Sequence, residues 1–282
     1  MAGTLLSIGH GYSARALAEL LIAEGWNVIG TTRSEEKAAA LEDTGVTPVI
    51  WPGEPLPLEC ATHVLSSVAP SSEGDPVIAG ASAVLRSARH LEWVAYLSTT
   101  GVYGDHGGDW VDESTSLSPS TARGRARVVA EAEWAGVGLP LHIFRLAGIY
   151  GPGRGPFAKV RQGTARRIIK DGQVFSRTHV SDIAQVLRAS IRRPDPGAVY
   201  NVCDDDPAPP QDVIEHAAEL LDSPVPPAVA FEAADLSPMA RSFYAESKRV
   251  RNDRIKDELG VELLYPTYRE GLAQMLRDEK GG

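Results

Sequence analysis

The first half of the chain alternates short apolar runs with amphipathic helical patterns. Residues 4–8 form a mostly apolar run of strand length, and apolar positions from Ala14 to Ile22 then recur with the spacing of one helix face. Gly25 follows as a helix-ending glycine. Strands that alternate with helices are typical of a parallel sheet covered by helices on both faces. We therefore predict a doubly wound parallel α/β sheet.

The same criteria predict further elements of this alternating kind. Strands are expected at 26–30, 48–51, 63–68, 93–97 and 141–146, and helices at 34–41, 77–90 and 122–134. A polar, glycine-rich loop at 98–119 separates two of these elements.

The sequence pattern changes after Tyr150. Residues 151–156 read as a rigid Gly/Pro turn, and the later pieces are shorter and richer in proline. A helix at 180–191 and a strand at 198–202 fit the main sheet. We predict a first domain at 1–150, to which 178–203 returns, and a smaller discontinuous C-terminal substrate lobe made of 151–177 and 204–282.

Composition narrows the range of partners. The 282 residues carry 28 Lys plus Arg against 37 Asp plus Glu, a net charge of −9. Such an acidic chain has no electrostatic reason to bind nucleic acid or anionic membrane lipid, so we expect small-molecule or protein partners. The chain has no apolar run of the ~20 residues that a membrane span needs.

Cysteine usage and the N-terminus bear on location. Cys60 and Cys203 lie far apart and form no metal-ligand pattern, so no metal site is expected and a reducing compartment is indicated. Residues 1–8 lack the cationic region and the apolar length of a signal peptide. We expect a soluble, cytoplasmic protein.

A glycine pattern follows the first predicted strand and opens the first predicted helix. Gly9-x-Gly11-x-x-Ala14 in this context is typical of a dinucleotide-binding loop of the Rossmann type. Gly9 allows the tight turn, Gly11 lets backbone N–H groups approach a pyrophosphate, and Ala14 keeps the helix close to the strand. The alternative is a plain strand–helix turn without a ligand.

The end of the second predicted strand indicates which nucleotide binds. NAD-preferring loops place an acid there for the ribose 2′-hydroxyl, whereas this chain has Thr32, Arg33 and Ser34. The Arg33 guanidinium can hold a 2′-phosphate, so NADP is favoured over NAD, with Glu35 or Glu36 as the alternative acid. The expected cofactor-binding residues are Gly9, Gly11, Tyr12, Ser13, Ala14, Arg15, Thr32, Arg33, Ser34 and Val68. For Arg15 a surface role is the alternative.

Four blocks in order carry a family resemblance: residues 9–14, 98–104 (STTGVYG), 145–153 (RLAGIYGPG) and 179–184 (HVSDIA). Together they resemble the NAD(P)-dependent epimerase/dehydratase family of the extended short-chain dehydrogenase/reductase superfamily, and an atypical member of it. The resemblance covers residues 1–206. It implies that the Thr99 hydroxyl bonds the reacting oxygen of the substrate, the alternative being a strand-end cap. Thr100 and Gly101 stand where dehydratases of this kind carry acids, which disfavours dehydration.

The resemblance also implies a departure at the family's Tyr-x-x-x-Lys signature. Arg123 stands in place of the tyrosine and Arg127 in place of the lysine, and an offset alignment onto Thr121 and Arg125 lacks a phenol as well. Arginine stays protonated and cannot act as a general base. Arg127 remains a candidate to donate to the nicotinamide ribose, and a solvated helix face is the alternative for both arginines.

Other polar residues are expected to be solvated or structural. Asp105 and His106 lie on the loop after the strand at 93–97, where a solvated position is the usual outcome. His179 is expected to be structural. The basic stretch 248–256 is interleaved with acids and is interpreted as a solvated helical face.

Arginines are the expected substrate-binding residues. Arg154 and Arg177, with Arg145 as a further candidate, are expected to line an anionic substrate pocket, because the family mostly handles nucleotide-diphosphate sugars.

Two functions from different classes remain open. The first is an NADP-dependent oxidoreductase or epimerase acting on a nucleotide sugar or a similar carbonyl compound without the usual tyrosine. The second is a non-catalytic NADP-binding sensor or scaffold, because removal of hydride from an alcohol needs a group that takes the hydroxyl proton. The resemblance also implies a homodimer that pairs through the helices at 77–90 and 122–134.

Overall fold

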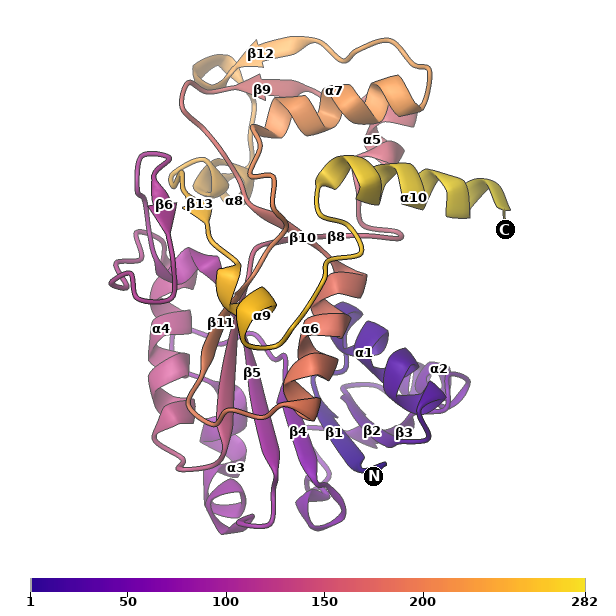
Figure 1. Cartoon of the computed structure of the whole chain (residues 1–282), viewed down its shortest axis with the longest axis vertical. Helices are drawn as coiled ribbons and strands as arrows, with labels where there is room; N and C mark the ends of the chain where they lie inside the picture. Colours follow the sequence, from indigo (N-terminus) through magenta and orange to yellow (C-terminus); the bar gives the residue numbers. More distant parts are fainter. Residues whose placement is uncertain (1, 282) are drawn as a thin grey trace.

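A parallel sheet of seven strands forms the centre of the molecule in the computed structural model, which describes residues 2–281 (Figure 1). Its strand order, β11-β7-β5-β4-β1-β2-β3, confirms the predicted doubly wound fold. The interior strand β5 is buried at six of its seven positions, as expected for a strand covered on both faces. The strands are β1 (Thr4–Ile8), β2 (Asn27–Thr32), β3 (Thr47–Ile50), β4 (His63–Ser66), β5 (Trp93–Thr99), β7 (Leu141–Leu146) and β11 (Val199–Val202).

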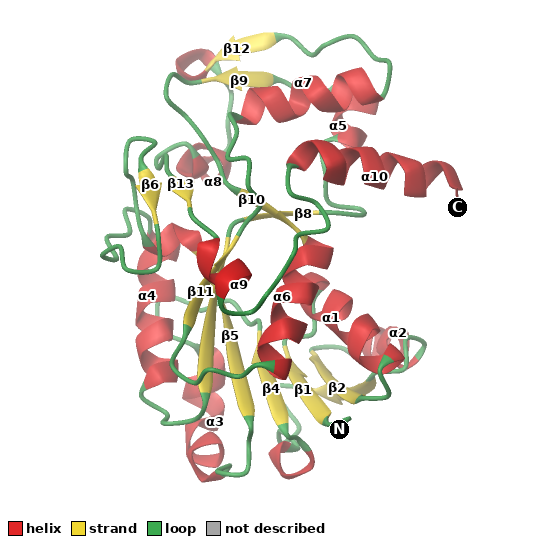
Figure 2. Cartoon of the chain, in the orientation of Figure 1, coloured by secondary structure: helices red, strands yellow, loops and turns green. Residues whose placement is uncertain are grey.

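Helices cover both faces of this sheet (Figure 2). The helices α1 (Tyr12–Ala23), α2 (Glu35–Glu42) and α6 (Val180–Arg192) pack their apolar residues into one cluster with Leu5 and Ala95 of the sheet. The helices α3 (Pro76–Ser87) and α4 (Ala122–Ala135) pack into a second cluster on the opposite face, with Leu6 and Val94. Successive strand residues therefore face opposite cores, as the period of a strand requires.

A smaller lobe lies beyond one end of the sheet (Figure 1). Its own apolar cluster is built from α5 (Phe157–Arg161), α7 (Pro210–Leu220) and α10 (Tyr268–Gly281). Beside α7, the short strands β9 (Arg167–Ile169) and β12 (Ala228–Ala230) form a parallel pair.

Short paired strands connect the two parts of the molecule. β8 (Gly148–Tyr150) pairs with β10 (Arg177–His179), and β6 (Trp110–Val111) pairs with β13 (Arg249–Val250). The remaining segments are α8 (Pro238–Phe243), α9 (Asp253–Asp257) and the 3₁₀ turns η1 (Leu58–Cys60), η2 (Thr100–Val102) and η3 (Phe231–Ala233).

The C-terminal part of the chain does not lie wholly in the small lobe. Ile255, Leu259 and Val261 pack in the apolar cluster of the large sheet with Ile183 and Leu187 of α6. The division into domains stays a prediction, and this segment shows that residues within 204–282 also contact the sheet.

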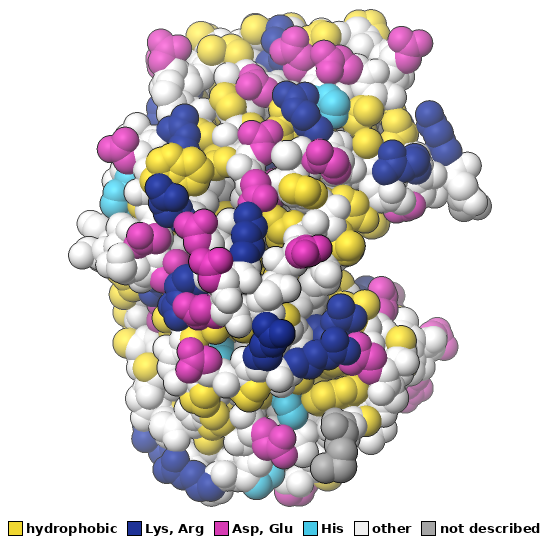
Figure 3. Space-filling model, viewed as in Figure 1, with side chains coloured by type: hydrophobic (Ala, Val, Ile, Leu, Met, Phe, Trp, Pro, Cys, Tyr) yellow, Lys and Arg dark blue, Asp and Glu magenta, His cyan; other side chains and the backbone are white. Residues whose placement is uncertain are grey.

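The surface carries mixed charge. On the face drawn in Figure 3, Lys and Arg side chains are interspersed with Asp and Glu, and a notch separates the small lobe from α1 and α2. Among residues 2–281, no helix combines the length and apolarity required to cross a lipid bilayer.

Candidate functional site

A cleft of about 1320 Å³ lies between the sheet and the small lobe. It opens at the carboxyl ends of the strands, where doubly wound sheets bind ligands. The structure brings together eight residues expected from the sequence, which line this one cleft: Gly9, Gly11, Tyr12, Ser13, Thr99, Arg127, Arg154 and Arg177.

The turn between β1 and α1 requires its first glycine. Gly9 has φ of +76°, and a Cβ at this position would lie 2.8 Å from Val68 Cγ2. The backbone N–H of Gly9 donates to Thr31 Oγ1 at 2.8 Å, and Ser67 Oγ donates to the Gly9 carbonyl. Val68 therefore lies against the turn, and Thr31 of β2 and Ser67, the residue after β4, fix its position.

Gly11 leaves the start of α1 open toward the cleft. No side chain within residues 2–281 caps this helix, and the nearest atom to a Cβ on Gly11 would be the Gly9 carbonyl oxygen at 3.6 Å. The uncapped N–H groups and the helix dipole favour an anion here. Ala14 is fully buried against the sheet. This geometry fits a diphosphate group.

The residues expected to select the nucleotide lie at the end of β2, outside the cleft lining. Arg33 is exposed, Thr32 is half-buried, and Ser34 caps α2 by accepting from the Lys37 N–H at 3.4 Å. Arg15 is exposed on α1.

Sequence reasoning missed His10 in the same turn. Its side chain is buried, and neither ring nitrogen has a hydrogen-bond partner within residues 2–281. Burial and the Arg15 charge lower the His10 pKa to about 4, so this ring is neutral at physiological pH.

Thr99 both caps the end of its strand and faces the cleft, so it is placed for each of the two roles considered above. Its Oγ1 accepts from the Gly101 N–H at 3.2 Å and so caps the turn η2, while the residue also lines the cleft. Because the hydroxyl uses a lone pair for that contact, its proton can still be donated to a ligand.

The two arginines in place of the tyrosine and the lysine make specific contacts. Arg127 Nη1 donates to Tyr96 Oη at 3.0 Å and to the Leu97 carbonyl at 2.5 Å. Arg123 Nη2 donates to Ser242 Oγ at 2.9 Å, and its guanidinium lies 4.6 Å from the Phe243 ring centroid. Both residues line the cleft, and Arg123 joins α4 to α8 across it.

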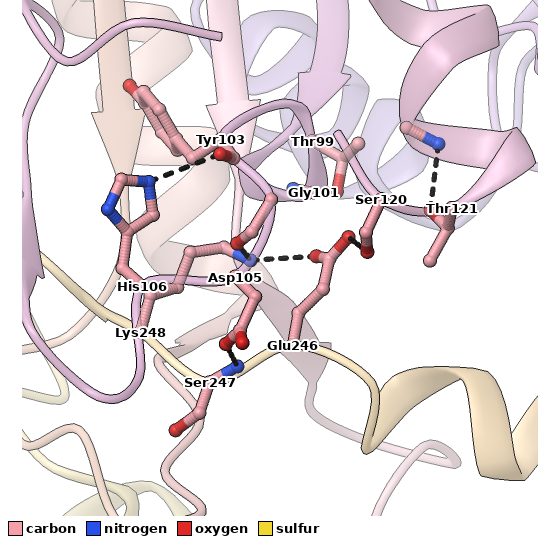
Figure 4. A network of polar contacts seen from close by, with 12 residues as sticks. Thr99, Gly101, Tyr103, Asp105, His106, Ser120, Thr121, Glu246, Ser247 and Lys248 are labelled. Atoms are coloured by element: carbon pink, nitrogen blue, oxygen red, sulfur yellow. Dashed lines mark hydrogen bonds and ion pairs between the residues drawn. The ribbon is translucent and has the colours of Figure 1, made fainter. Parts of the chain in front are cut away.

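Glu246 and Lys248 form a buried ion pair that lines the same cleft (Figure 4). Lys248 Nζ lies 2.8 Å from Glu246 Oε2 and donates to the Gly104 carbonyl at 2.7 Å. Ser120 Oγ donates to Glu246 Oε1 at 2.6 Å. These contacts hold the pKa of Glu246 below its usual value despite burial. The interpretation of residues 248–256 as a solvated helical face was wrong for the first part of the stretch, because Lys248 is buried and β13 begins at Arg249, whereas a helix, α9, does begin at Asp253.

The expectation that Arg145 lines a substrate pocket was also wrong. Arg145 is buried and pairs with Glu131 of α4 at 2.8 Å. Ser98 Oγ donates to the same carboxylate, and Arg145 Nη1 donates to Tyr103 Oη at 3.0 Å. The Tyr103 hydroxyl donates in turn to Asn201 Oδ1 at 2.7 Å, so this network joins β5, β7, β11 and α4.

The other titratable residues singled out by the sequence are engaged in local structure. Asp105 Oδ1 accepts from the Ser247 N–H at 2.7 Å, and a His106 ring nitrogen lies 3.2 Å from the Tyr103 carbonyl oxygen. His179 is buried, and its Nδ1 accepts from the Ser181 N–H at the start of α6. None of these three lines the cleft within the described part of the chain.

The two expected substrate arginines enter the cleft from the small-lobe side. The Arg154 guanidinium lies 5.7 Å from the Tyr12 ring centroid. Arg177 Nη1 donates to the Phe175 carbonyl at 2.9 Å and to the Ala208 carbonyl at 3.0 Å. Behind it, Asp204 is buried, and neither of its carboxyl oxygens has a hydrogen-bond partner within residues 2–281.

Comparison with known proteins places the chain among relatives along its whole length. No family model matches it. A protein of unknown function from Silicibacter pomeroyi is 60% identical, with a TM-score of 0.95 over 99% of this chain and 100% of that one. Protein YeeZ of Escherichia coli is 28% identical over 92% of this chain and 95% of its own length.

Other solved structures that resemble this chain are named as epimerases or dehydratases. A candidate NAD-dependent epimerase/dehydratase from Methylobacillus flagellatus is 25% identical, with a TM-score of 0.75 over 99% of this chain and all of that one. More distant structures of the same fold include three epimerases and one dehydratase at 13–18% identity.

Proposed function

We propose that this chain, a member of the NAD-dependent epimerase/dehydratase family, is an NADP-dependent oxidoreductase that acts on a small carbonyl compound. One observation carries the proposal: a single cleft joins the uncapped start of α1 to Thr99, Arg127 and Lys248. A bound nicotinamide nucleotide supplies or accepts the hydride, and the side chains named here position the substrate.

The first part of the proposal concerns the cofactor: the protein binds NADP in preference to NAD. The open turn at Gly11 suits the diphosphate, and β2 ends without an acid at the ribose position. Arg33 stands exposed there, where its guanidinium can hold a 2′-phosphate. Among the solved relatives, a dTDP-glucose 4,6-dehydratase was determined with NAD and a human epimerase family protein with NADPH, so the fold accommodates either nucleotide.

Nucleotide titrations test this half. We expect NADPH to bind tighter than NADH, and Arg33→Ala to weaken NADPH by about tenfold to a hundredfold while leaving NADH unchanged, since a charge-assisted contact is worth roughly 1.5–3 kcal/mol. Lys37→Ala, which removes a neighbouring exposed cation, is the control. Equal affinities of the unchanged protein for both nucleotides would contradict NADP preference, and binding of neither would overturn the proposed function.

The chemical half of the proposal assigns the substrate oxygen to Thr99 and Lys248. The Arg123 guanidinium cannot take a proton from an alcohol. A hydroxyl and an ammonium group can both donate to an oxygen on which negative charge develops. The Lys248 ammonium can also give the proton that converts the resulting alkoxide into an alcohol, which fits the reductive direction. A Streptomyces protein that is 29% identical over 52% of this chain carries the name 3-diazoavenalumate denitrifying reductase, in line with this direction.

Turnover is measured as loss of nicotinamide absorbance with a panel of carbonyl compounds. Thr99→Val is expected to suppress the rate with little change in NADPH affinity. A Thr99→Val protein that turns over at the original rate would show that Thr99 does not contact the reacting oxygen.

A second candidate function is a non-catalytic NADP-binding protein. It is favoured by Arg123, which joins α4 to α8 at the position where the family resemblance implies the catalytic tyrosine. Tight NADPH binding with no oxidation of NADPH across the whole panel would favour this candidate.

We also propose that the protein is a homodimer that pairs through α3 and α4. Each helix carries an exposed valine, Val84 at 52% and Val129 at 50% exposure, which a partner surface would cover.

A further inference from the structure

The small-lobe wall of the cleft is largely apolar. Phe175 and Tyr244 line it, with their rings in an edge-to-face arrangement at a centroid distance of 5.7 Å. Further apolar side chains of the lining come from β9, the loop before β10, α7, β12 and the segment before α8: Ile168, Val174, Val213, Ile214, Val229 and Leu236. A wall of this kind binds apolar or aromatic ligand surface.

Arg177 stands in this wall without a salt-bridge partner among residues 2–281. Arg177 lines the cleft, and its Nη1 is fixed by the carbonyls of Phe175 and Ala208. No carboxylate within residues 2–281 lies within ion-pair distance of it. Arg177 is close enough to Tyr244 for its charge to oppose the rise in the pKa of that phenol caused by burial. An aromatic surface and a guanidinium without a salt bridge therefore lie side by side, with the buried Asp204 carboxyl close enough to act on Arg177.

The neutral polar side chains of the lining are hydroxyls of Ser, Thr and Tyr. The amides of Asn and Gln and the ring of His can donate to and accept from sugar hydroxyls through separate atoms. Among the described residues, none of these three types lines the cleft. Asp235 and Glu246 are its only acids in the described chain, and Glu246 is engaged by Lys248 and Ser120.

We propose that the small-lobe half of the cleft binds a planar aromatic carboxylate, with its ring against Phe175 and Tyr244 and its carboxylate on Arg177. The inference rests on the proposed function, since it names the substrate class of the same cleft. It replaces the nucleotide sugar expected from the family resemblance, because apolar and aromatic side chains lie beside Arg177 in this wall.

Four probes separate the contributions of charge and ring. Cinnamate has both features, cinnamyl alcohol lacks the charge, 3-cyclohexylpropanoate lacks the planar ring, and UDP-glucose represents a nucleotide sugar. We expect calorimetry on the full-length protein, with and without NADP, to show cinnamate binding about tenfold tighter than cinnamyl alcohol and several-fold tighter than the cyclohexyl acid.

Variants locate the binding to this wall. Tyr244→Leu is expected to weaken cinnamate several-fold without changing the cyclohexyl acid, and Arg177→Met to weaken both acids about tenfold without changing the alcohol. Arg161→Ala removes a small-lobe arginine outside the cleft and serves as the control. If Arg177→Met fails to fold, Tyr244→Leu and the comparison of probes still decide the question.

The inference is overturned if cinnamate binds no tighter than cinnamyl alcohol, if UDP-glucose binds tighter than cinnamate, or if Tyr244→Leu has no effect on cinnamate. The same samples are titrated with NADPH. A protein that binds NADPH but prefers UDP-glucose would overturn the substrate class alone, whereas a protein that binds neither nicotinamide nucleotide would overturn the proposed function.

Discussion

Lys248 carries an ammonium group that is almost fully removed from water. Its side chain and that of Glu246 are each 10% exposed, and the Gly104 carbonyl takes a further proton of the ammonium. A charge in such a position depends on its partner, because the cost of removing it from water is offset only by close contacts. The pair is thus both part of the cleft wall and a source of stability that depends on both residues.

Removing one member of this pair should reveal that dependence. We expect Lys248→Met to lower the free energy of unfolding by about 3 kcal/mol, because it leaves the Glu246 carboxylate buried without a cation. The double variant Glu246→Gln/Lys248→Met should lose less, and urea denaturation measures both. As the control, Lys256→Met breaks an exposed pair with Asp205 and should cost about 1 kcal/mol or less. Equal losses for Lys248→Met and Lys256→Met would show that the buried pair does not stabilise the fold.

Asp204 makes stability depend on pH. Burial raises the pKa of this carboxyl to about 8, although the Arg177 charge opposes the shift. The unfolded chain releases the same proton near pH 4. Between these values the folded protein holds a proton that the unfolded chain has lost, so the contribution of Asp204 to stability falls as pH rises.

The variant Asp204→Asn should remove this dependence. Its free energy of unfolding relative to the natural protein should rise from pH 5 to pH 8, by up to ~1.4 kcal/mol per pH unit. Denaturation at several pH values measures the difference, with the exposed residue change Asp257→Asn as the control. A difference that stays constant over this range would mean that Asp204 ionises normally in the folded protein.

At the level of elements, the sequence predicts the long helices and strands, in which buried apolar positions recur over many residues. The strand at 141–146 and the helix at 180–191 were predicted almost to their observed ends, because each carries a continuous apolar pattern. β6 and β13 have two residues each, and β8, β9, β10 and β12 have three, which is too short for any periodicity. Their pairing depends on contacts between distant segments.

The same distinction explains what was found of the site. The nucleotide turn is local, and Gly9 and Gly11 could be identified from spacing alone. Lys248 reaches the cleft beside the pairing of β13 with β6, whose partners Trp110 and Arg249 are 139 positions apart in the sequence. Nothing in the sequence around Lys248 indicates that pairing, and the alternating charges of the stretch favoured a solvated helix.

The helices α3 and α4 form the proposed homodimer interface. If the chain is a homodimer through these helices, Val84→Glu/Val129→Glu should convert it to a monomer, because a charge would be buried without a partner. Light scattering measures the mass of both proteins. Val225→Glu, at a valine of the small lobe that is 44% exposed, is the control. A natural protein that is monomeric, or a double variant that stays dimeric, would contradict the proposed interface.

At the scale of the whole molecule, charge is distributed unevenly between the surface and the cleft. The chain has a net charge of −9, yet cations outnumber acids among the residues that line the cleft. These cations are Arg123, Arg127, Arg154, Lys159, Arg166, Arg177 and Lys248. A concave surface of one sign concentrates the field and raises the local concentration of oppositely charged ligands. The molecule can therefore attract an anionic nucleotide and an anionic substrate while its overall charge is negative.

The strand β11 at the edge of the sheet limits where the chain can be truncated. A fragment that ends at residue 150 would lack both β11 and α6, so the edge of β7 and the apolar faces of α1 and β5 would be uncovered. Unpaired strand edges beside exposed apolar surface promote aggregation. The nucleotide-binding half is consequently not an independent cassette, and truncations for crystallisation or domain exchange need to retain the chain through residue 202 at least.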